Sequence, residues 1–438
     1  MPETDSRSNR DAGPPLAEPR LSTRPVTALV VLLPVCWLLG VRDFAWVIAA
    51  VPMVAGLARL SAVRTPPGFG LWLLFLTWVL MSVIQIDNAD RLLGFVYRGL
   101  LYASATVVLL YVYNVALQGT PWRRVTGAMT ALWIVVVAGG FLALLFPDVT
   151  ITTPAAQFVP ARFATNELIG EMIRPSLAQY SPDGFFDLSP RPSAPFAYTN
   201  NWGNAYSLLL PFVLVHAASL PARHRARPVL MAVIAVSLVP ALLSLNRGMY
   251  LALAVGLAYV GVRMGIRGQV SGLVVTGSLA LAAMVVVQFL PVTDLLAQRL
   301  ASSATNETRF SVYQQAVDGT LKSPVFGYGA PRPAEQPSQP SVGTQGQFWT
   351  VLFSQGFPGA AMFVGWLLAT CLRSARPPHN AGLWLHGTLV MATIEVFYYG
   401  ILGAGLTVVM VAAALTAAQS VERSSHVRAP VVAGDRSS

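Results

Sequence analysis

Two arginines in separate polar segments are the first candidates for chemistry. Arg247 lies in Ser244-Leu-Asn-Arg-Gly248, a short polar break between two apolar runs. Arg309 lies in the polar stretch that begins at Asn306, and Tyr313 follows four residues later, so both side chains can project from one helix face. A guanidinium stays charged and can bind phosphate oxygens bidentately. The short turn keeps Arg247 close to the rest of the protein and favours an anion ligand, with an interfacial arginine in a tight turn as the alternative.

A third polar segment, Ala194-Pro-Phe-Ala-Tyr-Thr-Asn-Asn-Trp-Gly203, leads into another apolar run. Its proline, asparagines and glycine predict irregular backbone with hydrogen-bond donors left available. At membrane depth such backbone persists only when it is buried in protein or lines a polar cavity. Asn201 is therefore a candidate substrate ligand, and Arg191 is a candidate because it lies just before this segment. The alternative is an ordinary helix N-cap at Asn200 or Asn201.

Several kinds of site are disfavoured by what the sequence lacks. The polar segments 147–203 and 291–347 contain no histidine, and no His/Cys/Asp cluster has metal-ligand spacing. The segments predicted below to be cytoplasmic contain no phosphate-binding glycine loop. These observations argue against a zinc enzyme and against an ATP-driven pump. The acidic and cationic side chains that remain for chemistry in the two segments include Asp183, Asp187, Glu335 and the single lysine, Lys322.

The elements that must position these residues are membrane helices. Of the 438 residues, 54% are hydrophobic and only 11% are charged, which predicts an all-α polytopic membrane protein. We find about twelve apolar runs of spanning length. The predicted order is a disordered cytoplasmic tail (1–24), transmembrane helices 1–5 (25–146), a long loop (147–203), helices 6–9 (204–290), a second long loop (291–347), helices 10–12 (348–420) and a cytoplasmic tail (421–438).

The two long loops are predicted to form a folded cap on the extracytoplasmic side. Each has roughly 57 residues, and connections of that length are usually functional or disordered. Most arginines fall in the short connections and tails that share a side with the N-terminus, which is the positive-inside pattern. We therefore expect both termini in the cytoplasm. The net charge of +10 reflects this orientation and does not indicate nucleic-acid binding.

The order of these motifs resembles the O-antigen ligase and polymerase family. The resemblance rests on the Asn-x-x-Gly segment after a large outside loop, the Ser-x-x-Arg-Gly break, Arg-x-x-x-Tyr-x-x-Ala followed by Pro-x-x-Gly-x-Gly, and a Gly-x-x-Gly helix, all between Pro195 and Gly359. The flanking runs match in hydropathy alone. The resemblance implies a membrane glycosyltransferase in surface polysaccharide biosynthesis that acts on the outer face of the bacterial cytoplasmic membrane and needs no metal or nucleotide sugar.

The resemblance also implies substrates and roles for particular residues. The donor would be a glycan on undecaprenyl diphosphate, the acceptor a hydroxyl of a glycan or lipid, and the partners membrane lipid and polysaccharide assembly proteins. Arg247 and Arg309 match the motif arginines of the family. Where the family commonly has a histidine, this chain has Gly343-Thr-Gln-Gly-Gln347, so Gln345 is a candidate for orienting a hydroxyl. The candidates for the general base are Glu335, Asp183 and Asp187, and the alternative is that transfer depends more on stabilisation of the leaving group. The expected substrate-binding residues are Arg191, Asn201, Tyr313, Lys322 and Gln347.

Two other functions stay open at this point. A transporter or flippase of a lipid-linked glycan should place ionisable groups near the membrane midplane, where Glu395, His216 and His386 are the candidates. A non-catalytic subunit of a polysaccharide assembly complex is the second alternative, because the family histidine is missing. The sequence also leaves the choice between polymerase and ligase open, since both use the same kind of donor and differ in the acceptor.

Overall fold

The computed structural model describes residues 19–164, 166–179, 189–301, 304–334 and 340–428 and is helical apart from two short strands. Its first half contains α1 (Arg24–Leu39), α2 (Phe44–Leu57), α3 (Phe69–Met81), η1 (Ser82–Gln85), α4 (Ala89–Leu117), α5 (Trp122–Leu145), η2 (Pro154–Gln157), α6 (Ala161–Ala164), α7 (Glu167–Ile173), β1 (Ala178–Gln179) and β2 (Arg191–Pro192). Its second half contains α8 (Thr199–Ser219), α9 (Ala226–Leu243), α10 (Arg247–Ile266), α11 (Val270–Phe289), α12 (Val292–Ala301), α13 (Ala304–Lys322), α14 (Gln347–Arg373), α15 (Asn380–Glu395) and α16 (Ala404–Arg428).

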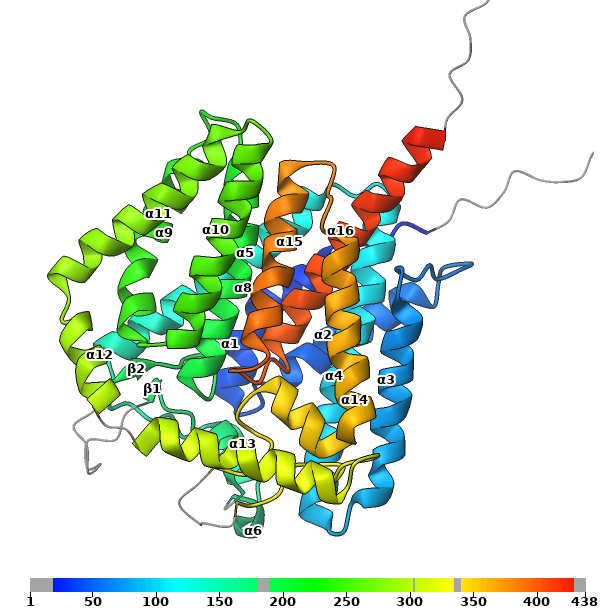
Figure 1. Cartoon of the computed structure of the whole chain (residues 1–438), viewed down its shortest axis with the longest axis vertical. Coiled ribbons are helices and arrows are strands. Elements are labelled where there is room, and N and C mark those ends of the chain that lie inside the picture. The colour runs from blue at the N-terminus through cyan, green and yellow to red at the C-terminus, as the bar shows by residue number, and fades with distance from the viewer. Residues whose placement is uncertain (1–18, 165, 180–188, 302–303, 335–339, 429–438) are drawn as a thin grey trace, which may run out of the picture.

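Each predicted apolar run coincides with a helix of this bundle (Figure 1). Seven helices are long and apolar enough to cross a membrane by length and composition, namely α4, α5, α9, α10, α11, α14 and α16, the last counted to Val421. Three shorter apolar segments, α1, α2 and α3 with η1, lie beside them. The chain is therefore a multi-pass membrane protein with an all-helical architecture.

Three boundaries differ from the prediction. Hydropathy places the start of the fourth apolar run at Val96, but helix α4 begins at Ala89, because the Asn88 side chain accepts the Arg91 N–H (2.9 Å) and caps a polar first turn. Helix α8 begins at Thr199 with Tyr198 as N-cap, so neither Asn200 nor Asn201 is the cap and residues 199–203 are helical. Helix α16 continues to Arg428, well past the expected end at 420.

The core of the bundle is formed by α4, α5, α8 and α16. In the most apolar part of α16, 83% of residues are buried, whereas the corresponding share for α11 is 6%. Helix α16 is rich in alanine, and small side chains let helices approach closely in a membrane, where packing replaces the hydrophobic effect as the main force between helices. Helix α11 lies at the outer edge, where lipid would cover most of it (Figure 1).

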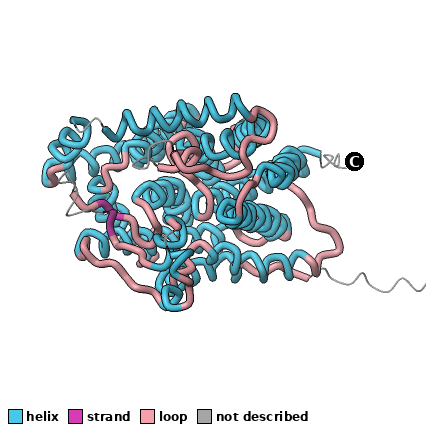
Figure 2. The backbone as a smooth tube through the Cα atoms, turned by 90° about the horizontal axis from the view of Figure 1, so that it is seen from below, coloured by secondary structure: helices cyan, strands magenta, loops and turns pink. Residues whose placement is uncertain are grey.

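The described parts of both long connections lie at the same end of the bundle. Helix α13 runs across the ends of the other helices, and α6, α12, β1 and β2 lie at the same end of the bundle (Figure 1). Figure 2 views the molecule from this end and shows most helices end-on, with the two strands at one edge. Strand β1 pairs antiparallel with β2, and the Arg42 guanidinium donates to the carbonyl of Glu171 (3.2 Å), which ties the first connection to α1 and α2.

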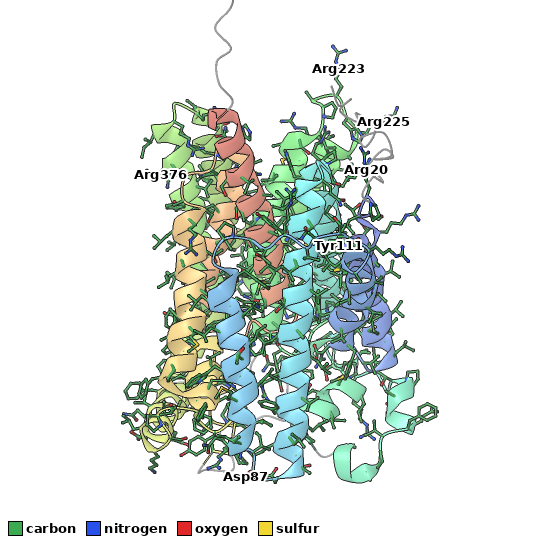
Figure 3. All side chains as sticks on the ribbon, turned by 90° about the vertical axis from the view of Figure 1, so that its right-hand side faces the viewer. Arg20, Asp87, Tyr111, Arg223, Arg225 and Arg376 are labelled. Carbon is green, nitrogen blue, oxygen red and sulfur yellow. The ribbon has the colours of Figure 1, made fainter. Side chains whose placement is uncertain are left out.

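Arginines mark the opposite end of the bundle. Arg20, Arg223, Arg225 and Arg376 lie there together, far from Asp87 at the α13 end (Figure 3). Helix α16 also ends on the arginine-rich side (Figure 1). Of the tails expected at 1–24 and 421–438, residues 1–18 and 429–438 lie outside the described part of the chain.

Candidate functional site

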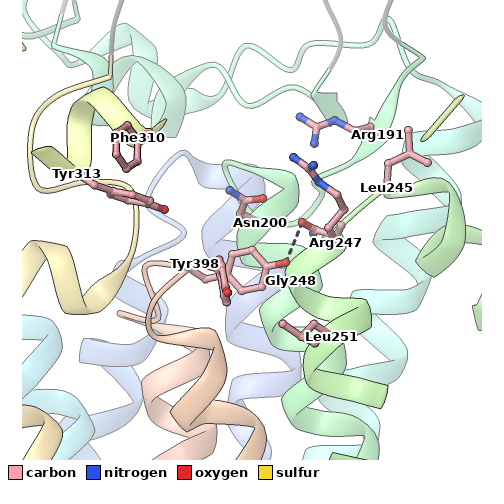
Figure 4. A pocket seen from close by; sticks show the side chains of 11 residues that line it. Arg191, Asn200, Leu245, Arg247, Gly248, Leu251, Phe310, Tyr313 and Tyr398 are labelled. Carbon is pink, nitrogen blue, oxygen red and sulfur yellow. Dashed lines mark hydrogen bonds between the residues drawn. The ribbon is translucent and has the colours of Figure 1, made fainter. Parts of the chain in front are cut away.

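A pocket of about 430 Å³ opens at the end of the bundle that α13 crosses (Figure 4). We call it the arginine pocket. Its walls come from segments that are far apart in the sequence: Arg191 of β2, Asn200 of α8, residues 245–248 and Leu251 at the start of α10, Phe310 and Tyr313 of α13, and Tyr398 and Tyr399 after α15. A site assembled from so many elements is the kind of concave, partly apolar pocket in which ligands bind.

Positive charge is concentrated on one wall of the arginine pocket. Arg191 and Arg247 extend their guanidinium groups toward the same region, with Asn200 beside them (Figure 4). Arg247 is also the first residue of the 20-residue helix α10, whose amino terminus carries partial positive charge. Two guanidinium groups and a helix N-terminus together favour an anion with several oxygens.

The backbone before Arg247 is strained. Leu245 has φ = 49°, and among the described residues it is the one non-glycine residue with positive φ. A left-handed leucine costs roughly 1–3 kcal/mol and persists only where its surroundings impose it. This turn ends α9 and starts α10 within three residues, which places Arg247 at the pocket wall.

A hydrogen-bond network fixes the floor of the pocket. The Tyr399 hydroxyl accepts the Met249 N–H (2.6 Å) and donates to Asn246 Oδ1 (3.1 Å), while Asn246 Nδ2 donates to the carbonyl of Thr199 (2.7 Å). The network joins α8, α10 and the segment after α15. It also explains the glycine in the Arg-Gly motif, because a Cβ on Gly248 would lie 2.7 Å from the Tyr399 hydroxyl.

The Pro-x-x-Gly-x-Gly motif (Pro324 to Gly329) supplies hydrogen-bond partners at a break in α14. Gly356 has φ = 69° and ψ = −171°, so α14 consists of two helical pieces, and Pro358 has no N–H to give to Ser354. The turn after α13 supplies the missing partners. The N–H of Tyr328 donates to Phe353 O (3.0 Å), the N–H of Gly329 to Ser354 O (2.7 Å), and Phe357 donates its N–H to Pro324 O (2.9 Å).

These hydrogen bonds also position α13, because the turn follows α13 directly in the chain. The buried face of α13 packs on the first piece of α14, where the Thr320 hydroxyl donates to Leu352 O (3.3 Å). Tyr313 is stacked on Trp349, with ring centroids 4.4 Å apart and an interplanar angle of 16°. The break in α14 thus sets where α13 crosses the bundle.

A charged network holds the segment after this turn. Arg91, with 8% of its side chain exposed, donates to Asp87 Oδ1 (2.6 Å), to Ala330 O (3.0 Å) and to Tyr328 O. Arg332 binds the other oxygen of Asp87 (2.8 Å) and lies over the Tyr328 ring (4.1 Å). The hydrogen bond from Arg91 is the main reason that the pKa of Asp87 lies below its ordinary value.

This network predicts a pH-dependent contribution to stability. A carboxyl with a lowered folded-state pKa stabilises the fold above its ordinary pKa and loses that contribution as the pH falls through the lowered value. We therefore expect Asp87→Asn to lower the melting temperature at neutral pH, and the difference from wild type to vanish in acid. Thermal unfolding of both proteins from neutral to acidic pH measures this difference in melting temperature, with Asp148→Asn, at an exposed residue, as control. A difference that does not depend on pH would contradict the role of the Asp87 charge.

The structure brings some of the predicted site residues together. Arg191, Arg247 and Tyr313 line the arginine pocket. Asn201 lies beside it, and its side chain donates to Gly400 O (3.3 Å), while its neighbour Asn200 faces the pocket. The carbonyl of Gln345 accepts a hydrogen bond from the Tyr313 hydroxyl (3.2 Å).

Other predicted residues lie elsewhere. Gln347 is buried, and its amide donates to the Tyr102 hydroxyl (2.7 Å) instead of facing the pocket. Lys322 is exposed at the last residue of α13. Arg309 belongs to α13, but its side chain lies outside the described part of the structure, and Glu335, Asp183 and Asp187 lie outside it altogether.

The sequence reasoning missed Asn200 as a lining residue, and also Asn246, Phe310, Tyr398 and Tyr399. Asn246 and Phe310 each sit directly beside a motif arginine, so their neighbours in the sequence were a usable signal. The two tyrosines follow an apolar helix near the C-terminus, and nothing in their local pattern places them beside Arg247.

Glu395, one of the three candidates for the transporter alternative, is the last residue of α15 and is fully buried against α8. Its carboxyl accepts hydrogen bonds from Asn204 and Ser207, and it is not among the residues that line the arginine pocket. Among the described residues, no group of three His, Cys, Asp or Glu side chains could hold a metal ion.

Comparison with known proteins bears on the same part of the chain. Residues 230–364 match the family model described as O-antigen ligase. The matched region runs from α9 through the break in α14 and contains Arg247, α13 and the turn that repairs α14. No curated protein sequence matches the chain. Over residues 230–364, this membrane protein therefore carries an O-antigen ligase domain.

Proposed function

We propose that the protein transfers or polymerises glycan from an undecaprenyl-diphosphate-linked donor to an acceptor hydroxyl at the outer face of the cytoplasmic membrane. The observation that carries the proposal is the convergence of Arg191, Arg247 and the amino terminus of α10 on one pocket at the end of a membrane bundle. The O-antigen ligase domain includes Arg247 and supports a glycosyltransferase-like enzyme. A lipid-linked donor has both an apolar tail for the bilayer and a diphosphate for this pocket.

The proposed reaction is a substitution at the anomeric carbon. The acceptor oxygen forms a bond to this carbon while the bond to the diphosphate oxygen breaks, and the lipid diphosphate leaves with that electron pair. Arg191 and Arg247 would stabilise the negative charge that grows on the leaving group, where a water-poor pocket makes such contacts strong. The proton of the acceptor hydroxyl must pass to a base, for which Glu335, Asp183 and Asp187 remain the proposed carboxylates.

We further propose that about twelve helices span the membrane, that both termini are cytoplasmic and that the α13 end faces outward. The arginine-rich end around Arg20, Arg223, Arg225 and Arg376 supports this orientation by the positive-inside rule (Figure 3). Reporter fusions after Arg225 and after Glu335 should report opposite sides of the membrane. Reporters on the same side would refute the orientation.

The function is tested most directly by the length of surface glycan in a deletion strain. Loss of long chains, with single units still attached to their final carrier, would identify a polymerase. Loss of all transfer, with polymer accumulating on the lipid carrier, would identify a ligase. Complementation with the wild-type chain should restore the original profile. An unchanged glycan profile in a strain without a second such enzyme would refute both forms of the proposal.

A further inference from the structure

A second hollow, of about 270 Å³, lies beside the arginine pocket and shares two residues with it. Its lining consists of Phe310, Tyr313, Gln314, Val317 and Asp318 of α13 together with Trp349 of α14. We call it the aromatic pocket. Phe310 and Tyr313 form the common wall, so a molecule in one pocket would lie next to a molecule in the other (Figure 4).

The two pockets differ in charge. Arg191 and Arg247 line the arginine pocket, whereas the aromatic pocket, among the residues whose side chains the structure describes, is lined by one carboxylate, one amide and no cation. A diphosphate would be attracted by the first and repelled by Asp318 in the second. The aromatic pocket is therefore suited to an uncharged ligand that can donate hydrogen bonds.

Tyr313 and Trp349 form an aromatic wall of this pocket, and the polar atom of each ring makes a hydrogen bond that holds the ring in place. The Tyr313 hydroxyl donates to Gln345 O (3.2 Å), and Trp349 Nε1 donates to Phe397 O (3.1 Å). The two rings stack on each other. A surface that is already rigid loses little conformational entropy when a ligand packs on it. This arrangement favours a ligand with a flat, apolar face.

Two polar side chains stand beside this wall. Gln314 and Asp318 are one turn apart on the exposed face of α13, and within the described part of the chain neither has a recorded hydrogen bond or ion pair. A pyranose ring has a face of C–H groups and a rim of hydroxyls. Its C–H groups pack against the negative π face of an aromatic ring. The carboxylate can accept hydrogen bonds from those hydroxyls, and the amide can donate or accept.

From these features we propose that the aromatic pocket binds a pyranose ring of the acceptor glycan. This inference rests on the proposed function, because the bound glycan is an acceptor only if the transfer reaction occurs. In that reaction the donor sugar must stay beside its diphosphate in the arginine pocket, and the attacking hydroxyl must approach from the adjacent space. Tyr313 and Phe310, which line both pockets, would then border both sugars, and Gln314 and Asp318 would orient the acceptor.

Binding of a lipid-free glycan to the purified full-length protein in nanodiscs tests the proposal. The probe is the oligosaccharide released by mild acid from the lipid-linked glycans of the same cells, so it has neither lipid nor diphosphate. We expect Asp318→Asn to weaken its binding by about tenfold, the effect of losing a hydrogen bond to a charged group. Trp349→Phe should weaken it as well. Arg247→Ala and the exposed control Asp148→Asn should bind the probe as the wild type does.

The same variants separate this proposal from the transfer reaction. If the protein binds the probe in an Asp318-dependent way but transfers no glycan, the pocket stands as a sugar site and the proposed function fails. If transfer proceeds while Asp318→Asn and Trp349→Phe leave both probe binding and the acceptor KM unchanged, the aromatic pocket is not the acceptor site. Absence of saturable probe binding to the wild type would also overturn the proposal. The fluorescence of Trp349, obtained as the difference between the wild type and Trp349→Phe, gives a further test. If brominated acyl chains quench this fluorescence and the oligosaccharide does not change it, the pocket contacts lipid and the proposal is overturned.

Discussion

Arg247→Ala should reduce glycan transfer by about 10²–10³-fold while the protein still inserts and accumulates normally. The guanidinium lies at the wall of the arginine pocket, at the positive end of α10, where it would act on charge that grows in the transition state. Its side chain is partly exposed to the pocket, so its loss removes no part of the packed core. Transfer is measured with lipid-linked donor and purified protein, and the amount of folded protein is measured in parallel.

Lysine should not rescue this position. An ammonium group carries the charge but cannot bind two phosphate oxygens in the planar geometry of a guanidinium, so Arg247→Lys should stay well below wild type. Arg174→Ala is the matched control, because this arginine is exposed in the first long connection and does not line the pocket. Normal transfer by the Arg247→Ala protein would remove the proposed role in binding diphosphate.

Two further variants compare the second arginine, Arg309, with Gln345. By its match to the motif, we expect Arg309→Ala to fail in the same way as Arg247→Ala. Gln345→Ala should have a mild effect, because the contact to Tyr313 uses the backbone carbonyl of Gln345 and alanine keeps that carbonyl. A well-folded but inactive Gln345→Ala protein would show that the amide itself holds the acceptor.

The sequence allowed the helices to be predicted better than the site. Hydropathy identified every apolar run because a membrane helix must be apolar over its whole length, whatever it packs against. Boundaries failed where local polar groups decide them. Asn88 extends α4 into a polar turn that hydropathy cannot detect, and Tyr198, the N-cap of α8, has extended backbone and makes no capping hydrogen bond with its side chain.

The arginine pocket could be predicted only where a motif carried it. Arg247 was found because its charge interrupts two apolar runs within a few residues. Tyr399 contributes as much to the pocket, yet its partners Asn246 and Met249 are about 150 positions away, and no local pattern reports such a contact. Gln347 shows the opposite case: it belongs to a polar stretch near the motif, but it is buried against Tyr102.

The glycine motif was predictable as a pattern but not as a mechanism. From the sequence, Gly327-Tyr-Gly329 reads as a turn that redirects the chain. In the structure, this turn supplies hydrogen bonds that the break at Gly356 removes from α14. The distance in sequence between donor and acceptor, together with the positive φ of Gly356, makes this relation visible only in three dimensions.

The largest effect on the fold around the site is expected from Gly327→Ala. Gly327 has φ = 59°, and a Cβ placed there would lie 2.4 Å from Phe353 O and 2.7 Å from Gly356 N. Positive φ alone costs an alanine roughly 1–3 kcal/mol. The clash adds to this cost, because both contacts are with backbone and no change of rotamer can relieve them. We expect the turn to separate from α14, α13 to shift and transfer to be lost.

The matched control for this prediction is Gly119→Ala. Gly119 has a similar positive φ of 74°, but a Cβ there would meet no atom within 4 Å. Both variants therefore carry the cost of the backbone conformation, and only Gly327→Ala carries the clash. Melting temperature in detergent and transfer activity should fall clearly further for Gly327→Ala than for Gly119→Ala. Equal losses in the two variants would mean that backbone conformation alone matters at Gly327, and that the close contact between the turn and the break in α14 does not hold α13 in place.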